Sequence, residues 1–459
     1  MIARFRTVLP FHSPPRATFC ALLLCVSVIP TRLLAGVLPG ELIEATVSAF
    51  FQSDREAERS NLADAIARTC RGNVGLVANL IGKVQIWGEL PQSGTFTVTG
   101  ENQSRVVIHY RLPPNYDPTQ AHPLVLCMPS KGETLTSLHA QAVQLLGPRA
   151  AECVFVSPAR PADETFHLPS DESAGMVYRL LRECKKRIHV DSNRAYLFGR
   201  QGGGDAAWHS ALMNADLFAG LVTVQSAPQL PYPEQSLPLL TRNLGSMKML
   251  PISTPSHPSE QDPRSQQVSA FADWLDMHAV QFGINGRGIR IPSLDAHTQI
   301  TTNLSSEFLG SSRPTFRPSV AHWFRYPTQG RAGWLRVAKF GGEVWRDDQL
   351  SILPAAGTDR NEYITSVLKE HLGFLGGRID GQTVDITAHR CAEIELLLPH
   401  HCVDFAQPIT VRCNGRVRHR GIIQPDVKTL LQTTYDDWDF QRPVVARLTF
   451  RIRADDGIP

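Results

Sequence analysis

The sequence lacks the cysteine spacing that marks zinc sites and disulfide frameworks. It has 459 residues and nine cysteines, and no two of them form a Cys-x-x-Cys pair. Beyond residue 35 the cysteines are Cys70, Cys127, Cys153, Cys184, Cys391, Cys402 and Cys413. Their odd number and wide scatter predict no metal centre, no cofactor and no disulfide framework. An oxidising compartment would permit one bridge among the last three.

An excess of charge of one sign is also missing. The formal net charge of +3 comes from 46 basic and 43 acidic side chains. Four arginines precede the first acid, Glu41, so residues 36–459 hold 42 basic against 43 acidic side chains. No basic stripe remains in that part, and we therefore expect no nucleic-acid partner.

Long apolar runs are scarce, and the one that matters lies near the N-terminus. Ala17–Ile29 follows Arg4 and Arg6, and Leu33-Leu34-Ala35 could precede a cleavage site. We expect residues 1–35 to be an export signal, with an uncleaved anchor as the alternative, because the run is short for a bilayer span. No other segment is long and apolar enough to cross a membrane. This predicts a protein without a membrane span after signal removal, secreted or located in the periplasm or cell envelope.

The spacing of apolar residues changes along the chain. Between residues 38 and 90 it is helical, which predicts a helical lead-in that packs on the main domain. Residues 91–310 alternate strand-like and helical runs, which predicts an α/β domain with a doubly wound, mainly parallel sheet. Gly, Ser and Pro at 310–320 indicate a linker or an irregular wrap.

Residues 321–459 are expected to form a small, β-sandwich-like domain. Short strand-like runs recur there at regular spacing with turn residues between them. The expected strands are Ala321–Tyr326, Gly333–Lys339, Glu362–Val367, Thr383–Thr387, Glu393–Leu398, Thr410–Asn414, Arg416–Ile423 and Val444–Ile452, with one helix at Asp426–Thr433.

One stretch of the α/β part has the pattern of a nucleophile elbow, but it lacks the nucleophile. The apolar run Arg194–Phe198 ends at Gly199, and a helical pattern begins after Gly202-Gly203-Gly204. Strand, glycine turn and helix are the context of the motif G-x-S-x-G, in which a sharp turn exposes the central serine. Here Gln201 occupies the serine position. An amide cannot form an acyl-enzyme, so covalent catalysis at this position is excluded.

Several phrases of the sequence resemble the α/β-hydrolase superfamily, in its branch of exported esterases, polyester depolymerases and peptidase-like proteins. The most specific is Ile188–Leu197, which leads into the elbow, and Ala215–Gly220 continues it. Arg111–Asp117 followed by Pro123–Leu126 resembles the entry into that family's first central strand. The tail, with Val403-Asp404-Phe405 and the segments after it, resembles the β-rich appendage of a secreted bacterial subset. The resemblance covers roughly residues 90–450 and implies fold more strongly than chemistry.

The resemblance assigns roles to particular positions. Gly202, just after the nucleophile position, would supply one oxyanion N–H, and the loop Met128–Gly132 would supply the second. Ser130 and Met128 would thus line the pocket, although Pro129 in this loop has no N–H to donate. His297 would be the general base, and Asp262 or Glu260 the acid that orients it.

Three functional hypotheses follow. In the first, the chain is a pseudo-esterase without hydrolytic activity. It binds a small ester, peptide or polymer in the cleft beside the elbow that would hold the substrate in a hydrolase, where the Gln201 amide could contact the ligand. In the second, it is an active ester or peptide hydrolase that uses Ser130, Ser226 or water activated by His297. In the third, it is a purely structural envelope protein. For Gln201 itself, the simpler interpretation is a turn that the fold needs and that has lost its serine.

Overall fold

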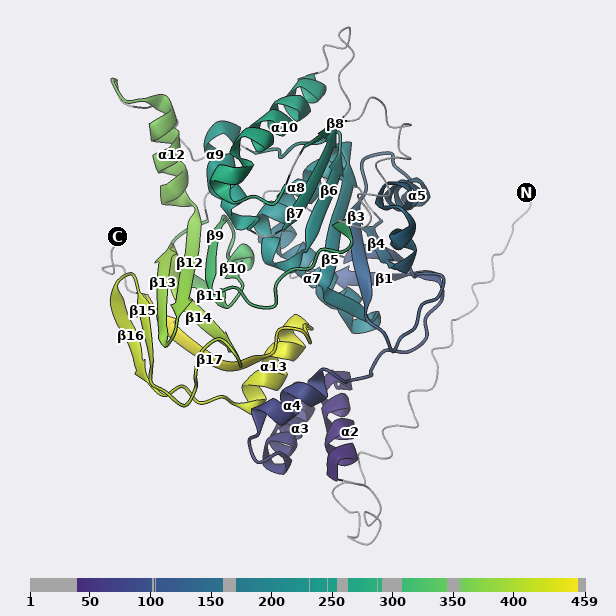
Figure 1. The fold of residues 1–459 in the computed structure, drawn as a ribbon, viewed down its shortest axis with the longest axis vertical. Helices are drawn as coiled ribbons and strands as arrows, with labels where there is room; N and C mark the ends of the chain where they lie inside the picture. The colour runs from purple at the N-terminus through teal and green to yellow at the C-terminus, as the bar shows by residue number, and fades with distance from the viewer. Residues whose placement is uncertain are drawn as a thin grey trace, which may run out of the picture.

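Figure 1 shows a computed structural model of the chain. The residues it describes are 39–100, 103, 105–159, 171–230, 232–245, 247–253, 263–286, 288–290, 308–344, 354 and 356–452. The expected export signal therefore lies outside the described residues. Among the described helices, none has the length and apolar character needed to cross a membrane.

A mixed eight-stranded sheet forms the centre of the α/β part (Figure 1). Its strands are β1 (Ser93–Thr99), β2 (Arg105–Arg111), β3 (His122–Met128), β4 (Val154–Pro158), β5 (Val190–Arg200), β6 (Gly220–Val224), β7 (Lys248–Ser253) and β8 (Ile289–Arg290). They lie in the order β1-β2-β4-β3-β5-β6-β7-β8. Strand β2 runs antiparallel to both its neighbours, and the strands from β4 to β8 run parallel to one another.

Helices cover both faces of this sheet, as the doubly wound prediction requires. Side chains of β3 alternate between two buried clusters, with Leu124 and Leu126 in one and Val125 and Cys127 in the other. The first cluster is covered by α7 (Asp171–Arg187), α8 (Gln201–Met213), α9 (Pro233–Leu240) and α10 (Pro263–Phe282), and the second by α5 (Leu135–Leu146). A strand buried on both faces is continuously apolar, which explains the unbroken run in β3.

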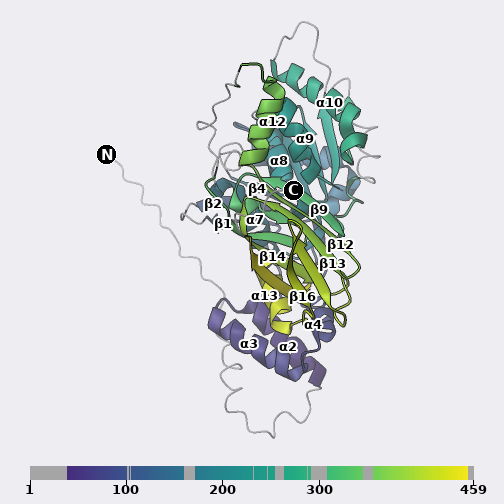
Figure 2. The same ribbon diagram turned by 90° about the vertical axis from the view of Figure 1, so that its left-hand side faces the viewer.

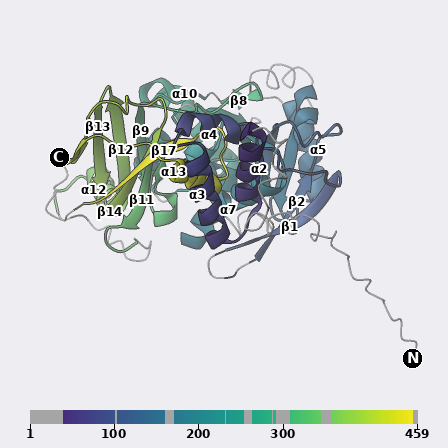
Figure 3. The same ribbon diagram turned by 90° about the horizontal axis from the view of Figure 1, so that it is seen from below.

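The N-terminal helices form as predicted, but their main packing partner is not the α/β part. Helices α2 (Pro39–Gln52), α3 (Glu56–Thr69) and α4 (Val74–Ile81) share a core with α13 (Val427–Asp437). Figures 1 and 3 show them beside α13, and Lys428 of α13 forms an ion pair with Asp64 of α3 at 2.5 Å. The apolar stripes of these helices reveal a buried face, but not the distant segment that covers it.

The remaining strands form two sheets that pack on one core (Figure 2). One contains β10 (Arg331–Ala332), β11 (Leu335–Phe340), β14 (Cys391–Pro399) and β17 (Val444–Arg451), and the other β16 (Arg416–Gly421), β15 (Ile409–Cys413), β13 (Thr383–His389), β12 (Gly373–Asp380) and β9 (Ser319–Phe324). Buried side chains from both sheets join a single cluster, in the manner of a β-sandwich.

One expected strand of this part is wrong. Residues 362–367 belong to helix α12 (Arg360–His371), not to a strand. The Asp359 side chain caps the helix by accepting a hydrogen bond from the Glu362 N–H at 2.9 Å. Ile364 and Leu368, one turn apart, form its buried face.

Candidate functional site

The predicted elbow is present between β5 and α8. Arg200 ends the strand with extended backbone angles (φ −125°, ψ 148°), and α8 begins at Gln201. Gln201 has a positive φ of 44°, in the left-handed direction that side chains other than glycine disfavour. Its side chain is exposed and forms no hydrogen bond within the described part of the chain. The turn thus presents an unpaired amide where the motif presents a nucleophile.

The glycines of the turn allow the backbone to approach its neighbours closely. A Cβ on Gly199 would lie 2.5 Å from the carbonyl oxygen of Gly203. A Cβ on Gly203 would lie 2.0 Å from the carbonyl oxygen of Met128, and one on Gly204 would lie 2.4 Å from the hydroxyl of Ser226. The glycine run therefore packs the turn against the ends of β3 and β6, and it needs no bound anion to explain it.

Ser130 joins the loop after β3 to the elbow. Its hydroxyl donates to the carbonyl oxygen of Arg200 at 2.6 Å and accepts from the N–H of Gly203 at 3.0 Å. Its own N–H donates to the carboxylate of Glu133 at 3.1 Å. Met128 is fully buried and contacts the turn through its carbonyl oxygen. The backbone N–H groups of Ser130 and Gly203 are thus already hydrogen-bonded within the protein.

Neither serine considered as a substitute nucleophile is hydrogen-bonded to a base within the described residues. The Ser130 hydroxyl is bound to main-chain atoms as just described. Ser226 is 2% exposed, and its hydroxyl has no hydrogen-bond partner among the residues that the structure describes. A serine hydroxyl becomes nucleophilic when an adjacent base accepts its proton. Within the described residues, neither hydroxyl is hydrogen-bonded to a histidine.

The proposed base and acid, His297 and Asp262, lie outside the described residues, as does Glu260. The structure instead shows an acid that the sequence does not single out. Asp205, on the first turns of α8, is 6% exposed and pairs with Arg264 of α10 at 2.8 Å. Its carboxylate also accepts a hydrogen bond from the Ala227 N–H at 3.4 Å. No spacing in the sequence could reveal this pair, because its members come from different helices.

A cavity of about 480 Å³ lies at a distinct place, between the α/β part and the sandwich. Its walls come from α9, the turn after α9, β9, α12, β12 and β13, and none of the elbow residues line it. Trp323 and Phe374 form its aromatic side, with ring centroids 4.7 Å apart. Arg242 and Lys369 supply positive charge, and Glu234 supplies a negative charge. This volume is within the range of small-molecule sites.

The described part of the chain contains neither a candidate metal site nor a disulfide. It contains no group of three or more His, Cys, Asp or Glu side chains placed to hold a metal ion. None of the seven cysteines named above forms a disulfide with another described residue. Burial raises the pKa of several of these thiols, to about 12 for Cys153, Cys391 and Cys402. These thiols are therefore protonated at neutral pH and poor nucleophiles.

Comparison with known proteins gives similarity in structure alone. No family model and no curated protein sequence matches the chain. The solved structures that resemble it are esterases and dipeptidyl peptidases. A thermostable esterase is 17% identical with a TM-score of 0.36, over 48% of this chain and 64% of that chain. Dipeptidyl peptidase 4 of Porphyromonas gingivalis is 11% identical (TM-score 0.35, 52% of this chain, 37% of that chain), and Est1E of Butyrivibrio proteoclasticus is 13% identical (TM-score 0.34, 47% and 98%). The match thus spans less than two thirds of the first esterase and of the peptidase.

Proposed function

We propose that this chain is an α/β-hydrolase-fold protein of the esterase and peptidase type that has lost hydrolysis and acts by binding. The observation that carries the proposal is Gln201 at the apex of the elbow, with a φ of 44°. An elbow holds its nucleophile in such a strained conformation, and the amide gains no reactivity from it. The frame is that of a serine hydrolase, and the reacting group is absent.

The surroundings of the elbow support the same conclusion. An oxyanion hole needs N–H groups that are free to donate to a developing negative charge. Of the predicted donors, the Ser130 N–H of the loop after β3 already donates to Glu133. The N–H of Gly203, the neighbour of the predicted donor Gly202, donates to the Ser130 hydroxyl. Glu133 also brings a negative charge to the loop, which would repel an oxyanion. The Ser130 N–H is therefore not free to donate to an oxyanion, which supports the loss of hydrolysis.

A binding role is supported by the separate cavity of about 480 Å³ at the domain junction. Its aromatic side and mixed charges suit a small ester, a peptide side chain or one unit of a polymer. We place the protein outside the cytoplasm, secreted or in the periplasm or envelope, on the signal-like pattern of residues 1–35.

The test compares the wild-type protein, Gln201→Ala and Gln201→Ser on short-chain activated esters and with a serine-reactive phosphonate. We expect the wild type and Gln201→Ala to be equally inert and to carry no phosphonate adduct. Turnover and labelling that appear only in Gln201→Ser would show that a base and an oxyanion site survive around the turn.

The opposite result would be a phosphonate adduct on any serine of the wild type, or ester turnover that Gln201→Ala retains above background. Either outcome would establish an active hydrolase with another nucleophile, and the binding proposal would be wrong. Mapping the adduct would then decide between Ser130, Ser226 and a serine outside the described residues.

A further inference from the structure

A small, highly charged cavity lies where three parts of the chain meet. Helix α7 comes from the α/β part, Arg313 and Arg331 from the segment that enters the sandwich, and Asp439 and Arg442 from the loop after α13. The cavity has a volume of about 40 Å³. A water molecule takes about 30 Å³ in the liquid, so there is room for one or two waters or one small ion.

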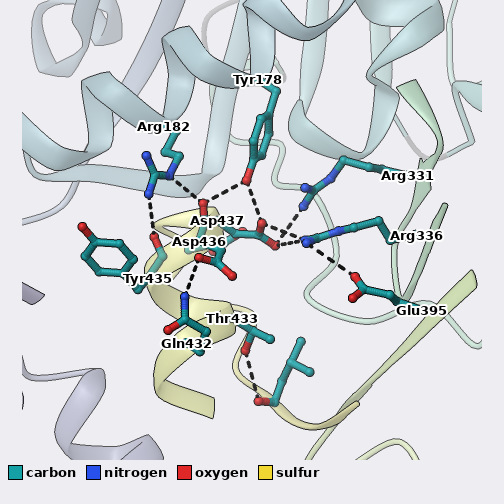
Figure 4. Close-up of polar contacts among 12 residues, drawn as sticks. Tyr178, Arg182, Arg331, Arg336, Glu395, Gln432, Thr433, Tyr435, Asp436 and Asp437 are labelled. Carbon is teal, nitrogen blue, oxygen red and sulfur yellow. Dashed lines mark hydrogen bonds and ion pairs between the residues drawn. The ribbon is translucent and has the colours of Figure 1, made fainter. Parts of the chain in front are cut away.

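Most charges around this cavity are paired. Figure 4 shows Tyr178, Arg331 and Arg336 converging on Asp437, which accepts hydrogen bonds of 2.8 Å from each of them. Burial alone would raise the pKa of Asp437, but the two arginines outweigh it and hold the pKa well below its usual range. In the same way Arg313, which is 5% exposed, forms a short ion pair with Asp439.

Two cations, Lys185 and Arg442, form no ion pair within the described residues, although Asp439 lies near enough to attract both. Lys185 of α7 is 6% exposed, lines the cavity and forms no hydrogen bond or ion pair through its ammonium in the described residues. Arg442 donates to the carbonyl oxygens of Asp216 at 3.2 Å and Pro314 at 2.7 Å, and its Nε has no partner among the described residues. Asp216 also lines the cavity and attracts Arg442, but its carboxylate forms no ion pair with either cation in the described part of the chain. The charged side chains that line this space, buried or half-buried, are therefore mostly cationic: Arg182, Lys185, Arg313, Arg331 and Arg442 against Asp216, Asp437 and Asp439.

Such an excess is unfavourable, because a buried charge without a partner loses its hydration and gains nothing in return. We propose that the cavity binds one small monovalent inorganic anion of the size of chloride, held by Lys185 and Arg442. The anion would bridge α7 of the α/β part to the loop that follows α13. It would act as a structural ion at the junction, independent of any activity at the elbow.

The experiment uses the full chain and measures its thermal midpoint as chloride replaces gluconate at constant ionic strength. Gluconate is too large for the cavity, so it serves as the non-binding salt. We expect chloride to raise the midpoint of the wild type in a saturable way, because a ligand that binds only the folded state stabilises it. Lys185→Met should lose this response. Lys186→Met is the matched control, because Lys186 lies on the same helix and pairs with Glu183 at 3.4 Å.

A second measurement keeps the proposal testable if Lys185→Met does not fold. The NMR line width of chloride should broaden in the presence of the wild type and narrow again when bromide competes. A midpoint that responds to chloride equally in the wild type and Lys185→Met would overturn the proposal. So would a wild type with neither a chloride-dependent midpoint nor a broadened resonance.

Discussion

The strained turn at Gln201 makes a prediction about stability that is separate from catalysis. A side chain other than glycine in the left-handed region costs about 1–2 kcal/mol relative to the right-handed one. Gln201, with its φ of 44°, should bear this cost, and glycine at the same position should not. We therefore expect Gln201→Gly to be more stable than the wild type.

The size of the effect follows from two opposing contributions. Relief of the left-handed strain is worth about 1–2 kcal/mol, and the greater freedom of glycine in the unfolded chain takes back about 0.5–1 kcal/mol. The net gain is about 1 kcal/mol. The Gln201 side chain adds little to this comparison, because it is exposed and forms no hydrogen bond with described residues. Gln201→Ala keeps the strained backbone, so its stability should be within about 0.5 kcal/mol of the wild type.

Urea unfolding of the three proteins, followed by circular dichroism, checks the prediction. The expected order places Gln201→Gly above the wild type and Gln201→Ala, which should be close to each other. If Gln201→Gly is no more stable than Gln201→Ala, the turn is not strained and the reasoning from φ fails. If Gln201→Ala alone loses stability, the Gln201 amide makes a stabilising contact, and the side chain at this position contributes to the folded state.

Two further predictions concern packing and pH. Gly203→Ala should destabilise the protein by on the order of 3 kcal/mol in the same urea assay, because the added Cβ would lie 2.0 Å from the Met128 carbonyl oxygen. Gly75→Ala is the control and should be nearly neutral, because its Cβ would have no contact closer than 3.6 Å. Burial, more than its basic neighbours, lowers the pKa of His139 from 6.5 to about 4, so between these pH values only the unfolded state takes up the proton. Stability should accordingly fall by about 3 kcal/mol in total as pH drops from 6.5 to 4, and His139→Gln should flatten this slope. An equal loss in both proteins would mean that other groups cause it.

Local sterics made the elbow and the central strands predictable from the sequence. The apolar run in β3 and the mostly apolar strand β6 are buried on both faces, because helices cover both sides of the sheet. Within the glycine run, Gly203 approaches the backbone of Met128 and Gly204 approaches the side chain of Ser226. These signals concern neighbours within one strand-turn-helix unit, so a single sequence is enough to show them.

Segments with mixed signals were harder to predict. The residues of α12 between 362 and 367 include β-branched and aromatic side chains, which favour a strand in a window of six residues. The spacing of Asp359 and Glu362 at the start of this helix was the better evidence, since it matches an N-cap followed by an acidic first turn. Strand β12 was missed because of its glycines, of which Gly377 makes room for the Trp334 ring 2.5 Å from where its Cβ would lie.

Long-range partners left no trace in the sequence. The core of the N-terminal helices is completed by Leu430, Leu431 and other side chains of α13, more than 300 residues further along the chain. The Ser130 hydroxyl, considered as a nucleophile, proves to be a hydrogen-bond link between a loop and the elbow. The roles of His297 and Asp262 stay predictions, because both lie outside the described residues.

The contacts of the turn explain how its backbone geometry can form with a glutamine at the apex. Gly203 and Gly204 are pressed against Met128 and Ser226 at the ends of two central strands, and Ser130 ties the turn to a third segment. These contacts hold the backbone at position 201 whatever side chain it carries. The strain at Gln201 is therefore imposed by packing of the turn against the sheet, and it does not require a nucleophile at position 201. For this reason the elbow geometry is evidence for the fold, and only the residue at its apex is evidence about the reaction.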